Sequence, residues 1–258
     1  MSSSADQLRV QESSLWVRAQ VMPYVLFMGF LLLSQFGGEL IEWNHPAAPW
    51  WRRWPNQWIY PLQTLVCLGY LIRHWRFYEF HWNLKWSLIA VVFGAVGIGL
   101  WLLPTTLYDH WKLEGETTGL MKWFGVAERK DGFNHHELEH PAAYFFSLVM
   151  RFLRAAVVVA MVEEIFWRSF LSRFVHKMEG SYWKLAFGVH STKIMLVTTL
   201  AFTFAHAPVD YAGAICYGLL TYLLYLRSKN LGACVIMHAT ANFLMGCYIM
   251  AYGKYGLW

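Results

Sequence analysis

Seven long apolar runs constrain the fold of this chain more than any other feature. They cover residues 21–41, 58–72, 86–103, 142–174, 194–207, 211–226 and 231–252. About 20 apolar residues in a helix are enough to cross the hydrocarbon core of a bilayer. A helix also satisfies its own backbone hydrogen bonds there. The runs therefore predict an all-α, polytopic integral membrane protein with seven to eight transmembrane helices, the eighth element being an interfacial or re-entrant helix at 182–193.

The composition agrees with a chain that is partly surrounded by lipid. Hydrophobic residues make up 57% of the sequence and charged residues 14%, against about 45–50% and about 25% in soluble domains. The sequence also has 15 Trp and 14 Tyr, which suit the membrane interface. We divide the chain into a polar N-terminal segment (1–20), accessory helices with an acidic loop at 105–140 (21–140) and a core of transmembrane helices (141–252), which is the candidate catalytic part for the reasons given below. Pro104 is expected to end the third helix before that loop.

The charges predict the orientation of the helices in the membrane. The net charge is +5, and alternation of seven spans brings most basic connectors to one side. These are Arg9, Arg18, Arg73, Arg76, Lys85, Arg173, Lys177, Lys184, Lys193, Arg227 and Lys229. By the positive-inside rule this side, with the N-terminus, is cytoplasmic, although Arg52 and Arg53 lie on the other side. The same distribution argues against nucleic acid as a partner.

A cluster of charged residues lies within the fourth run. Glu163, Glu164 and Arg168 would together cost very roughly 8–10 kcal/mol in lipid if they were unpaired, so they need partners and are candidates for function. Glu164 and Arg168 are four residues apart and can pair on one face of a helix. Glu163 is rotated by about 100° from Glu164 and points elsewhere. A partly desolvated carboxylate in that position suits a general base acting on water.

Two further polar motifs lie in later runs. Phe202 and His206 are four residues apart at the end of the fifth run, and His238 and Asn242 have the same spacing in the seventh. A single intramembrane His is often only a hydrogen-bonding partner between helices. Two Glu, an Arg, two His and an Asn spread over three apolar runs favour a functional site instead.

These motifs resemble the CAAX protease and bacteriocin-processing (CPBP/Abi) family of glutamic-type intramembrane proteases. The family pattern is EExxxR, FxxxH and HxxxN on three successive helices. This chain has Glu163-Glu164-x-x-x-Arg168, Phe202-x-x-x-His206 and His238-x-x-x-Asn242 in that order. The resemblance covers about residues 142–250. The sequence from Phe166 to Leu171 also resembles the branch of this family that is associated with bacterial exosortase sorting systems.

The resemblance implies an intramembrane endopeptidase that cleaves near the C-terminus of a membrane-anchored or lipidated protein or peptide. It implies that Glu163 and His206 activate water, that His238 and Asn242 stabilise the oxyanion, and that Glu164 and Arg168 hold the site together. Phe202 would shape the substrate pocket. Its setting would be a bacterial inner membrane.

Alternative functions remain open at this stage. Two His and a Glu could bind zinc, but the HExxH helix that would make this specific is absent. We therefore expect no cofactor, with zinc as the alternative. A non-catalytic immunity or scaffold protein is a second hypothesis. A proton-coupled transporter is a third, although the internal repeats common in transporters are absent.

Overall fold

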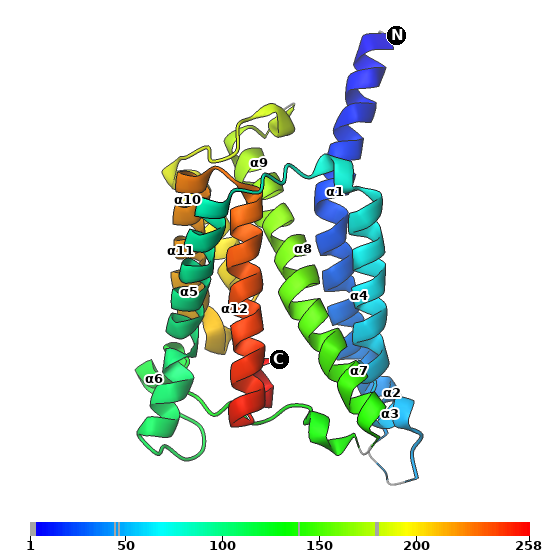
Figure 1. Cartoon of the computed structure of the whole chain (residues 1–258), viewed down its shortest axis with the longest axis vertical. Helices are drawn as coiled ribbons and strands as arrows, with labels where there is room; N and C mark the ends of the chain where they lie inside the picture. Colours follow the sequence, from blue (N-terminus) through cyan, green and yellow to red (C-terminus); the bar gives the residue numbers. More distant parts are fainter. Residues whose placement is uncertain (1–3, 44, 46, 139, 179–180) are drawn as a thin grey trace. The chain divides into compact units, whose positions relative to one another are not determined.

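The structure is a computed structural model that describes residues 4–43, 45, 47–138, 140–178 and 181–258. Regular structure in these residues is helical, without a strand (Figure 1), which confirms the all-α prediction. The chain forms two compact units. The first comprises Met1–Tyr78 with His135–Phe166, and the second comprises Glu79–Asn134 with Trp167–Trp258. The division at residues 20 and 140 stays a prediction, and its positions 1–3 and 139 lie outside the described residues.

The first unit is built from three long helical stretches. These are α1 (Ser4–Leu32), α4 (Asn56–Arg73), and the series α7 (Pro141–Phe152), η4 (Leu153–Val159) and α8 (Ala160–Glu164). Helix α4 packs against α1, α7 and η4, and α8 packs against α1. The shorter elements of this unit are η1 (Leu33–Gly37), α2 (Gly38–Ile41), α3 (Trp50–Arg53), η2 (Trp75–Phe77) and η3 (His135–Glu137).

Polar side chains tie these helices together inside the first unit. The Gln63 amide donates to the Phe27 carbonyl at 2.8 Å, and its oxygen accepts from Arg154 Nε at 2.6 Å. The Arg154 guanidinium also lies over the Tyr60 ring at 4.3 Å. One glutamine on α4 therefore links α1 to η4, and the intramembrane cation Arg154 is placed against an amide and an aromatic face.

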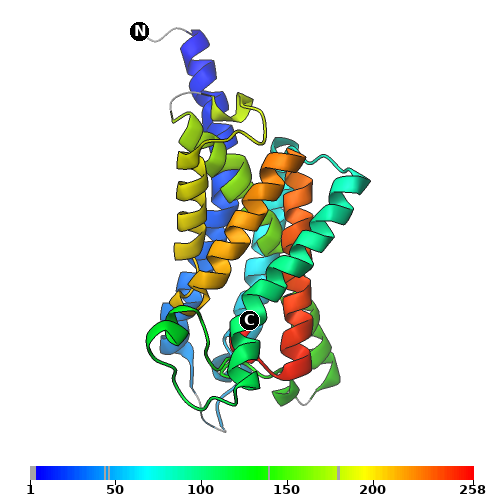
Figure 2. The ribbon, with the colours of Figure 1, turned by 90° about the vertical axis from the view of Figure 1, so that its left-hand side faces the viewer.

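The second unit is built around α5 (Leu84–His110), α10 (Thr192–Phe204), α11 (Tyr211–Ser228) and α12 (Leu231–Tyr252). Helix α5 packs against α11 and α12, and α11 also packs against α10. Figure 2 shows α11 between α10 and α5. The remaining elements are α6 (Gly119–Trp123), most of η5 (Ile165–Leu171), α9 (Ser172–His176), η6 (Tyr182–Lys184), η7 (Pro208–Asp210) and η8 (Tyr255–Leu257).

Local sequence signals set the starts of these helices. The N-caps of α5, α10 and α12 are Asn83, Ser191 and Asn230. Each of these side chains accepts a hydrogen bond from the backbone N–H of the third residue of its helix. Asn and Ser are strongly preferred there because they satisfy N–H groups that have no partner within the helix. Helix α12 ends at Gly253, whose φ of +64° is the left-handed conformation typical of a helix end.

Two predicted boundaries are wrong. Helix α5 continues through Pro104 to His110. Thr105 and Tyr108 beyond the proline are buried, and the Tyr108 hydroxyl donates to the Gly115 carbonyl at 2.8 Å. This packing offsets the cost of about 3 kcal/mol for a proline inside a helix. The additional helix considered at 182–193 is only the 3-10 turn η6, because α10 begins at Thr192.

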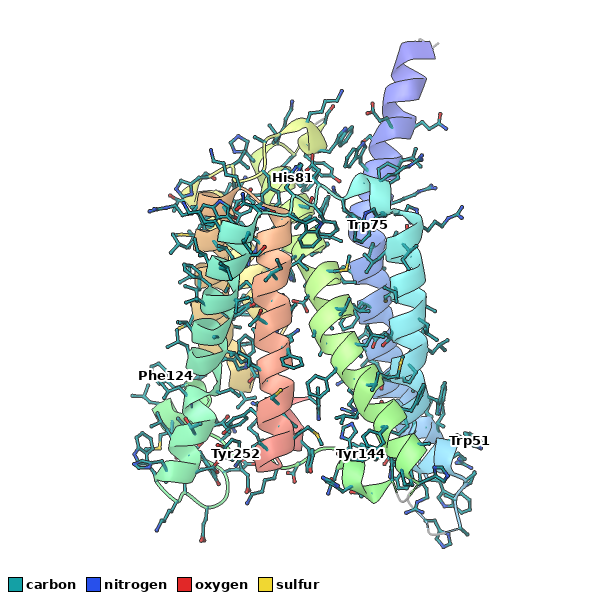
Figure 3. All side chains as sticks on the ribbon, in the orientation of Figure 1. Trp51, Trp75, His81, Phe124, Tyr144 and Tyr252 are labelled. Atoms are coloured by element: carbon teal, nitrogen blue, oxygen red, sulfur yellow. The ribbon has the colours of Figure 1, made fainter. Side chains whose placement is uncertain are left out.

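Within the described part of the chain, five helices are long and apolar enough to cross a membrane: Gln11–Gly37, Leu84–His110, Pro141–His176, Pro208–Ser228 and Leu231–Tyr252. The first begins within the segment expected to be polar, since α1 is already helical at Ser4. Figure 3 shows exposed aromatic side chains at both ends of each unit. Trp75 lies opposite Trp51 and Tyr144 in the first unit, and His81 lies opposite Phe124 and Tyr252 in the second. Such aromatic belts are typical of membrane interfaces.

Candidate active site

The two glutamates lie at the end of α8, between two π-helical segments. Glu164 is fully buried and Glu163 is partly exposed. η4 precedes α8 and η5 follows it. π-Helical turns are rare and occur frequently at functional sites, because the wider turn changes the direction in which side chains point. The backbone is therefore irregular on both sides of the EE motif.

Arg168 belongs to η5 and to the second unit, where it is fully buried. The sequence predicted that Arg168 shares a helical face with Glu164. In a π-helical segment the hydrogen bonds run from i to i+5, so a spacing of four residues does not by itself fix a common face. The pairing of Glu164 with Arg168 stays a prediction.

His206 lies two residues beyond the last residue of α10, and a hydrogen bond to the backbone orients its ring. Its Nδ1 lies 2.7 Å from the Phe202 carbonyl oxygen. Because a carbonyl oxygen can only accept, Nδ1 carries the proton and donates. In the neutral ring this leaves the lone pair on Nε2, the atom that can accept a proton. The FxxxH spacing thus orients the histidine as a base.

The second unit connects His206 to His238 through aromatic rings. Phe202 lies 4.5 Å from the His206 ring centroid and 6.1 Å from that of Tyr217. Tyr217, on α11, in turn lies 5.6 Å from His238 in a T-shaped arrangement. The structure therefore brings three residues predicted from the sequence into one cluster with Tyr217. We call Phe202, His206, Tyr217 and His238 the histidine cluster.

Two tryptophans flank this cluster. Trp101 on α5 lies 5.2 Å from His206 and 6.0 Å from Tyr217 between ring centroids. Trp167, within the EExxxR motif, lies 6.0 Å from Phe202 in a T-shaped contact. These apolar walls lower the local polarity around the two imidazoles, which strengthens electrostatic interactions there.

Two glycines of α5 allow the close approach that the cluster requires. A Cβ atom at Gly97 would lie 2.8 Å from the Tyr217 ring. A Cβ atom at Gly94 would lie 2.5 Å from the backbone oxygen of Met237, next to His238. Small residues let membrane helices pack closely in this way. Gly94 and Gly97 therefore position α12 and Tyr217.

Asn242 is partly buried on α12, one helical turn after His238. Residues four apart on an α-helix lie on the same face, so its amide and the His238 ring share one side of α12. The second unit contains five of the predicted site residues, Arg168, Phe202, His206, His238 and Asn242. The first unit contains the other two, Glu163 and Glu164.

The short length of α10 explains how His206 comes to lie in the same cluster as His238. The helix has 13 residues, about 20 Å at 1.5 Å per residue, which is less than the bilayer core of about 30 Å. His206 therefore lies beside Trp101, which precedes the end of α5 by nine residues.

Sequence reasoning missed Tyr217, Trp101 and Trp167. Tyr217 lies in the middle of its apolar run instead of at an end, where interfacial tyrosines occur, and this position was the available signal. Trp101 and Trp167 resembled ordinary membrane aromatics. Among the described residues, no group of three or more His, Cys, Asp or Glu side chains is gathered as in a metal site.

Part of the chain is similar to a known protein family. Residues 145–244 match the family model described as Type II CAAX prenyl endopeptidase Rce1-like. All the predicted site residues fall within this segment, so the resemblance to CAAX proteases is confirmed there. The match covers 100 of the 258 residues and supports a peptidase. No curated protein and no solved structure matches the chain. The exosortase-associated branch stays a prediction.

Proposed function

We propose that this protein is a glutamate-dependent intramembrane endopeptidase that hydrolyses a peptide bond near the C-terminus of a membrane-anchored protein or peptide. The observation that carries the proposal is the histidine cluster. It joins His206 and His238 from separate motifs within a segment similar to CAAX proteases. The orientation of His206, with Nε2 available as a base, supports a hydrolytic role.

In the proposed reaction Glu163 and His206 remove a proton from water. The resulting hydroxide adds to the carbonyl carbon of the scissile bond, and the carbonyl oxygen becomes an oxyanion. His238 and Asn242 donate hydrogen bonds to it, which is effective where water is scarce. The proton then passes to the leaving amine as the C–N bond breaks. Glu164 and Arg168 are positioning residues, and Phe202 shapes the substrate pocket.

We propose that this chemistry needs no metal ion. A carboxylate paired with an imidazole supplies general-base catalysis by itself. The oxyanion donors His238 and Asn242 take the place that a Lewis acid has in metalloproteases. A zinc-dependent enzyme is the alternative, and a chelator distinguishes the two.

We further propose seven spans in a bacterial inner membrane with the N-terminus in the cytoplasm. The two additional spans would be α4, with 18 residues, and the shorter apolar α10. Within the second unit, Lys177 and Lys184 lie between α9 and α10, Lys193 lies in the first turn of α10, and Lys229 lies between α11 and α12. In an alternating bundle these connectors are at one end of the helices. This bias supports a cytoplasmic location of that end. An exosortase-linked sorting protein is a candidate substrate.

The test is cleavage of a library of membrane-anchored reporters by purified protein in lipid vesicles. We expect wild-type protein to cleave, Glu163→Ala to be inactive, and a chelator to have no effect. Glu114→Ala, an exposed carboxylate in the loop, is the matched control and should cleave normally. Loss of activity with chelator would indicate a metal enzyme. No cleavage by folded wild-type protein across the library would favour a non-catalytic membrane protein.

A further inference from the structure

A short segment of the acidic loop presents large apolar side chains to the outside. In and beside α6, Leu120 is 74% exposed, Trp123 70% and Phe124 60%, and Met121 is also exposed. Four large apolar residues within five positions form a patch of the kind that marks an interaction site. We call residues 119–125 the α6 hairpin.

The α6 hairpin lies beside the last turns of α5. A Cβ atom at Gly125 would be 3.8 Å from Pro104 Cβ. Pro104 precedes the end of α5 at His110 by six residues, about 9 Å of helix. The hairpin therefore folds back to the depth of a membrane-spanning helix.

The backbone of the hairpin is suited to such a depth, where each unsatisfied polar group costs several kcal/mol. The amides of Phe124, Gly125 and Val126 donate to the carbonyls of Leu120, Lys122 and Met121 at 2.9–3.0 Å. The Val126 carbonyl accepts from the Thr117 hydroxyl. Gly125 has a φ of +78°, which closes the turn.

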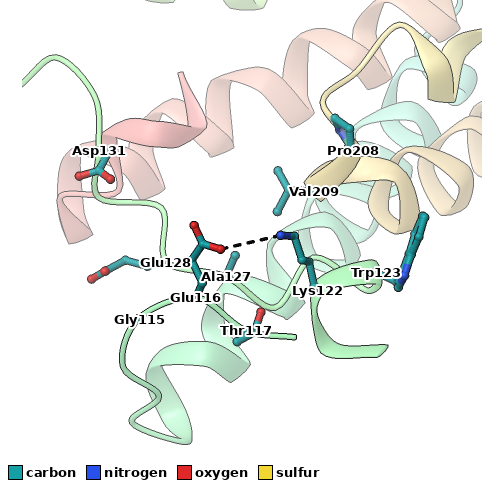
Figure 4. Close-up of a pocket in the computed structure, with 10 residues that line it drawn as sticks. All are labelled: Gly115, Glu116, Thr117, Lys122, Trp123, Ala127, Glu128, Asp131, Pro208 and Val209. Carbon is teal, nitrogen blue, oxygen red and sulfur yellow. Dashed lines mark ion pairs between the residues drawn. The ribbon is translucent and has the colours of Figure 1, made fainter. Parts of the chain in front are cut away.

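The hairpin has a polar side as well. Lys122 and Trp123 line a pocket of about 550 Å³ with Glu116, Glu128, Asp131 and Val209, and Lys122 forms an ion pair with Glu116 at 3.8 Å (Figure 4). A segment with charges on one side and large apolar side chains on the other is typical of structures that lie in the membrane interface. Lys122 can extend its ammonium group towards water from that position.

We propose that the α6 hairpin is a membrane-interface anchor whose Leu120 and Phe124 side chains insert among the lipids of one leaflet. Lipid is favoured as the occupant because α5, which the hairpin approaches at Pro104, is long and apolar enough to cross a membrane. Large hydrophobic residues are also exposed on or just after the later part of α5, namely Leu100, Leu103 and Trp111. The sequence had assigned this segment to a polar extramembrane loop.

The anchor is coupled to the candidate active site. A Cβ atom at Gly125 would clash with the Val209 carbonyl oxygen, so the hairpin lies directly against the α10–α11 connector. Val209 follows His206 by three residues. The depth of the hairpin therefore helps to fix the depth of His206 in the bilayer.

The test is nitroxide labelling of single cysteines in a variant whose four native cysteines are replaced by Ala. The purified full-length chain is reconstituted into vesicles of phosphatidylcholine and phosphatidylglycerol. Collisions with oxygen, which concentrates in lipid, are compared with collisions with a water-soluble nickel chelate. The test positions are Phe124→Cys and Leu120→Cys. Val92→Cys, on the exposed surface of α5, is the lipid control, and Glu114→Cys is the aqueous control.

We expect labels at positions 120 and 124 to collide with oxygen at least several-fold more than the Glu114→Cys label does, and to resemble the Val92→Cys label. Contrasting values at the two controls establish that the variants are folded and inserted. Nickel accessibility at both test positions equal to that of Glu114→Cys would overturn the proposal. Shielding from both reagents would also overturn it, because it would indicate a protein contact in place of lipid.

Discussion

At the scale of single residues, the best-defined feature of the site is the orientation of His206. Its Nδ1 donates to the Phe202 carbonyl at 2.7 Å, which leaves Nε2 for chemistry. The spacing of Phe202 and His206 was evident in the sequence, but the hydrogen bond was not. It depends on α10 ending at Phe204, so that the His206 ring can turn back towards a carbonyl of the last helical turn.

We therefore expect His206→Asn to fold but to lose activity. The Asn amide can still donate to the Phe202 carbonyl but has no counterpart of Nε2. The rate of cleavage should fall by about 10²–10⁴-fold, the usual contribution of a general base. The melting temperature in detergent should change little. A variant that retained most of its activity would show that His206 is not a base.

His135 gives the first unit a dependence on pH. It lies in η3, before the membrane-spanning helix begins, and burial together with the positive charge of Arg151 lowers its pKa to about 4. The unfolded chain therefore binds a proton near pH 6.5 that the folded chain does not bind until about pH 4. Stability due to this group is present above pH 6.5 and is lost as the pH falls towards 4.

We expect the melting temperature of the protein to fall between pH 6.5 and 4, and part of that fall to be absent in His135→Gln. Thermal unfolding at several pH values in detergent measures both. Equal pH dependence in wild type and His135→Gln would contradict this interpretation.

At the scale of elements, the packing of α5 against α11 and α12 positions the histidine cluster. The apolar runs predicted that these helices exist, because their length and composition leave few other structures. Their contacts could not be predicted, because they depend on where small residues meet. Gly94 and Gly97 are two of the three glycines in one apolar run. The continuation of α5 through Pro104 could not be predicted for a similar reason. It depends on the burial of Tyr108, which results from tertiary packing.

Gly94→Ala should destabilise the protein, because its Cβ atom would lie 2.5 Å from the Met237 backbone oxygen, which cannot move without α12. We expect a loss of about 1–3 kcal/mol, as for other overpacked cores, together with reduced cleavage. Gly99→Ala on the same helix is the control, because nothing lies within 4 Å of its Cβ position. Denaturant unfolding compares the two. Equal stability of both variants would contradict the close approach of α5 and α12.

At the scale of the whole chain, ion pairs join parts of the second unit that are far apart in the sequence. Arg129 donates to both carboxylate oxygens of Asp210 at 3.0 and 3.1 Å, and to the Gly256 carbonyl. Lys254 pairs with Asp109 at 2.6 Å. The positions of these charges in the sequence had indicated only an acidic loop. Their partners are up to 145 residues away in the chain, and a sequence without structure contains no signal for such pairs.

Arg129→Ala should cost about 3 kcal/mol, since removing one member of a mostly buried pair leaves the other charge uncompensated. The side chains of Arg129 and Asp210 are 11% and 15% exposed. Lys122→Ala breaks the pair with Glu116, whose side chains are 68% and 93% exposed, and should change stability by at most about 1 kcal/mol. Unfolding free energies of both variants test the difference, and a larger loss in Lys122→Ala would refute it.

The proposed mechanism requires that Glu163 and His206 activate one water molecule together. The most direct measurement is a double-mutant cycle on the rate of reporter cleavage with Glu163→Gln, His206→Asn and both. Groups that act in one step are strongly non-additive. We predict that each single variant loses about 10²–10⁴-fold and that the double variant is no slower than the slower single one. Losses that multiply in the double variant, or near-normal cleavage by either single variant, would contradict the claim.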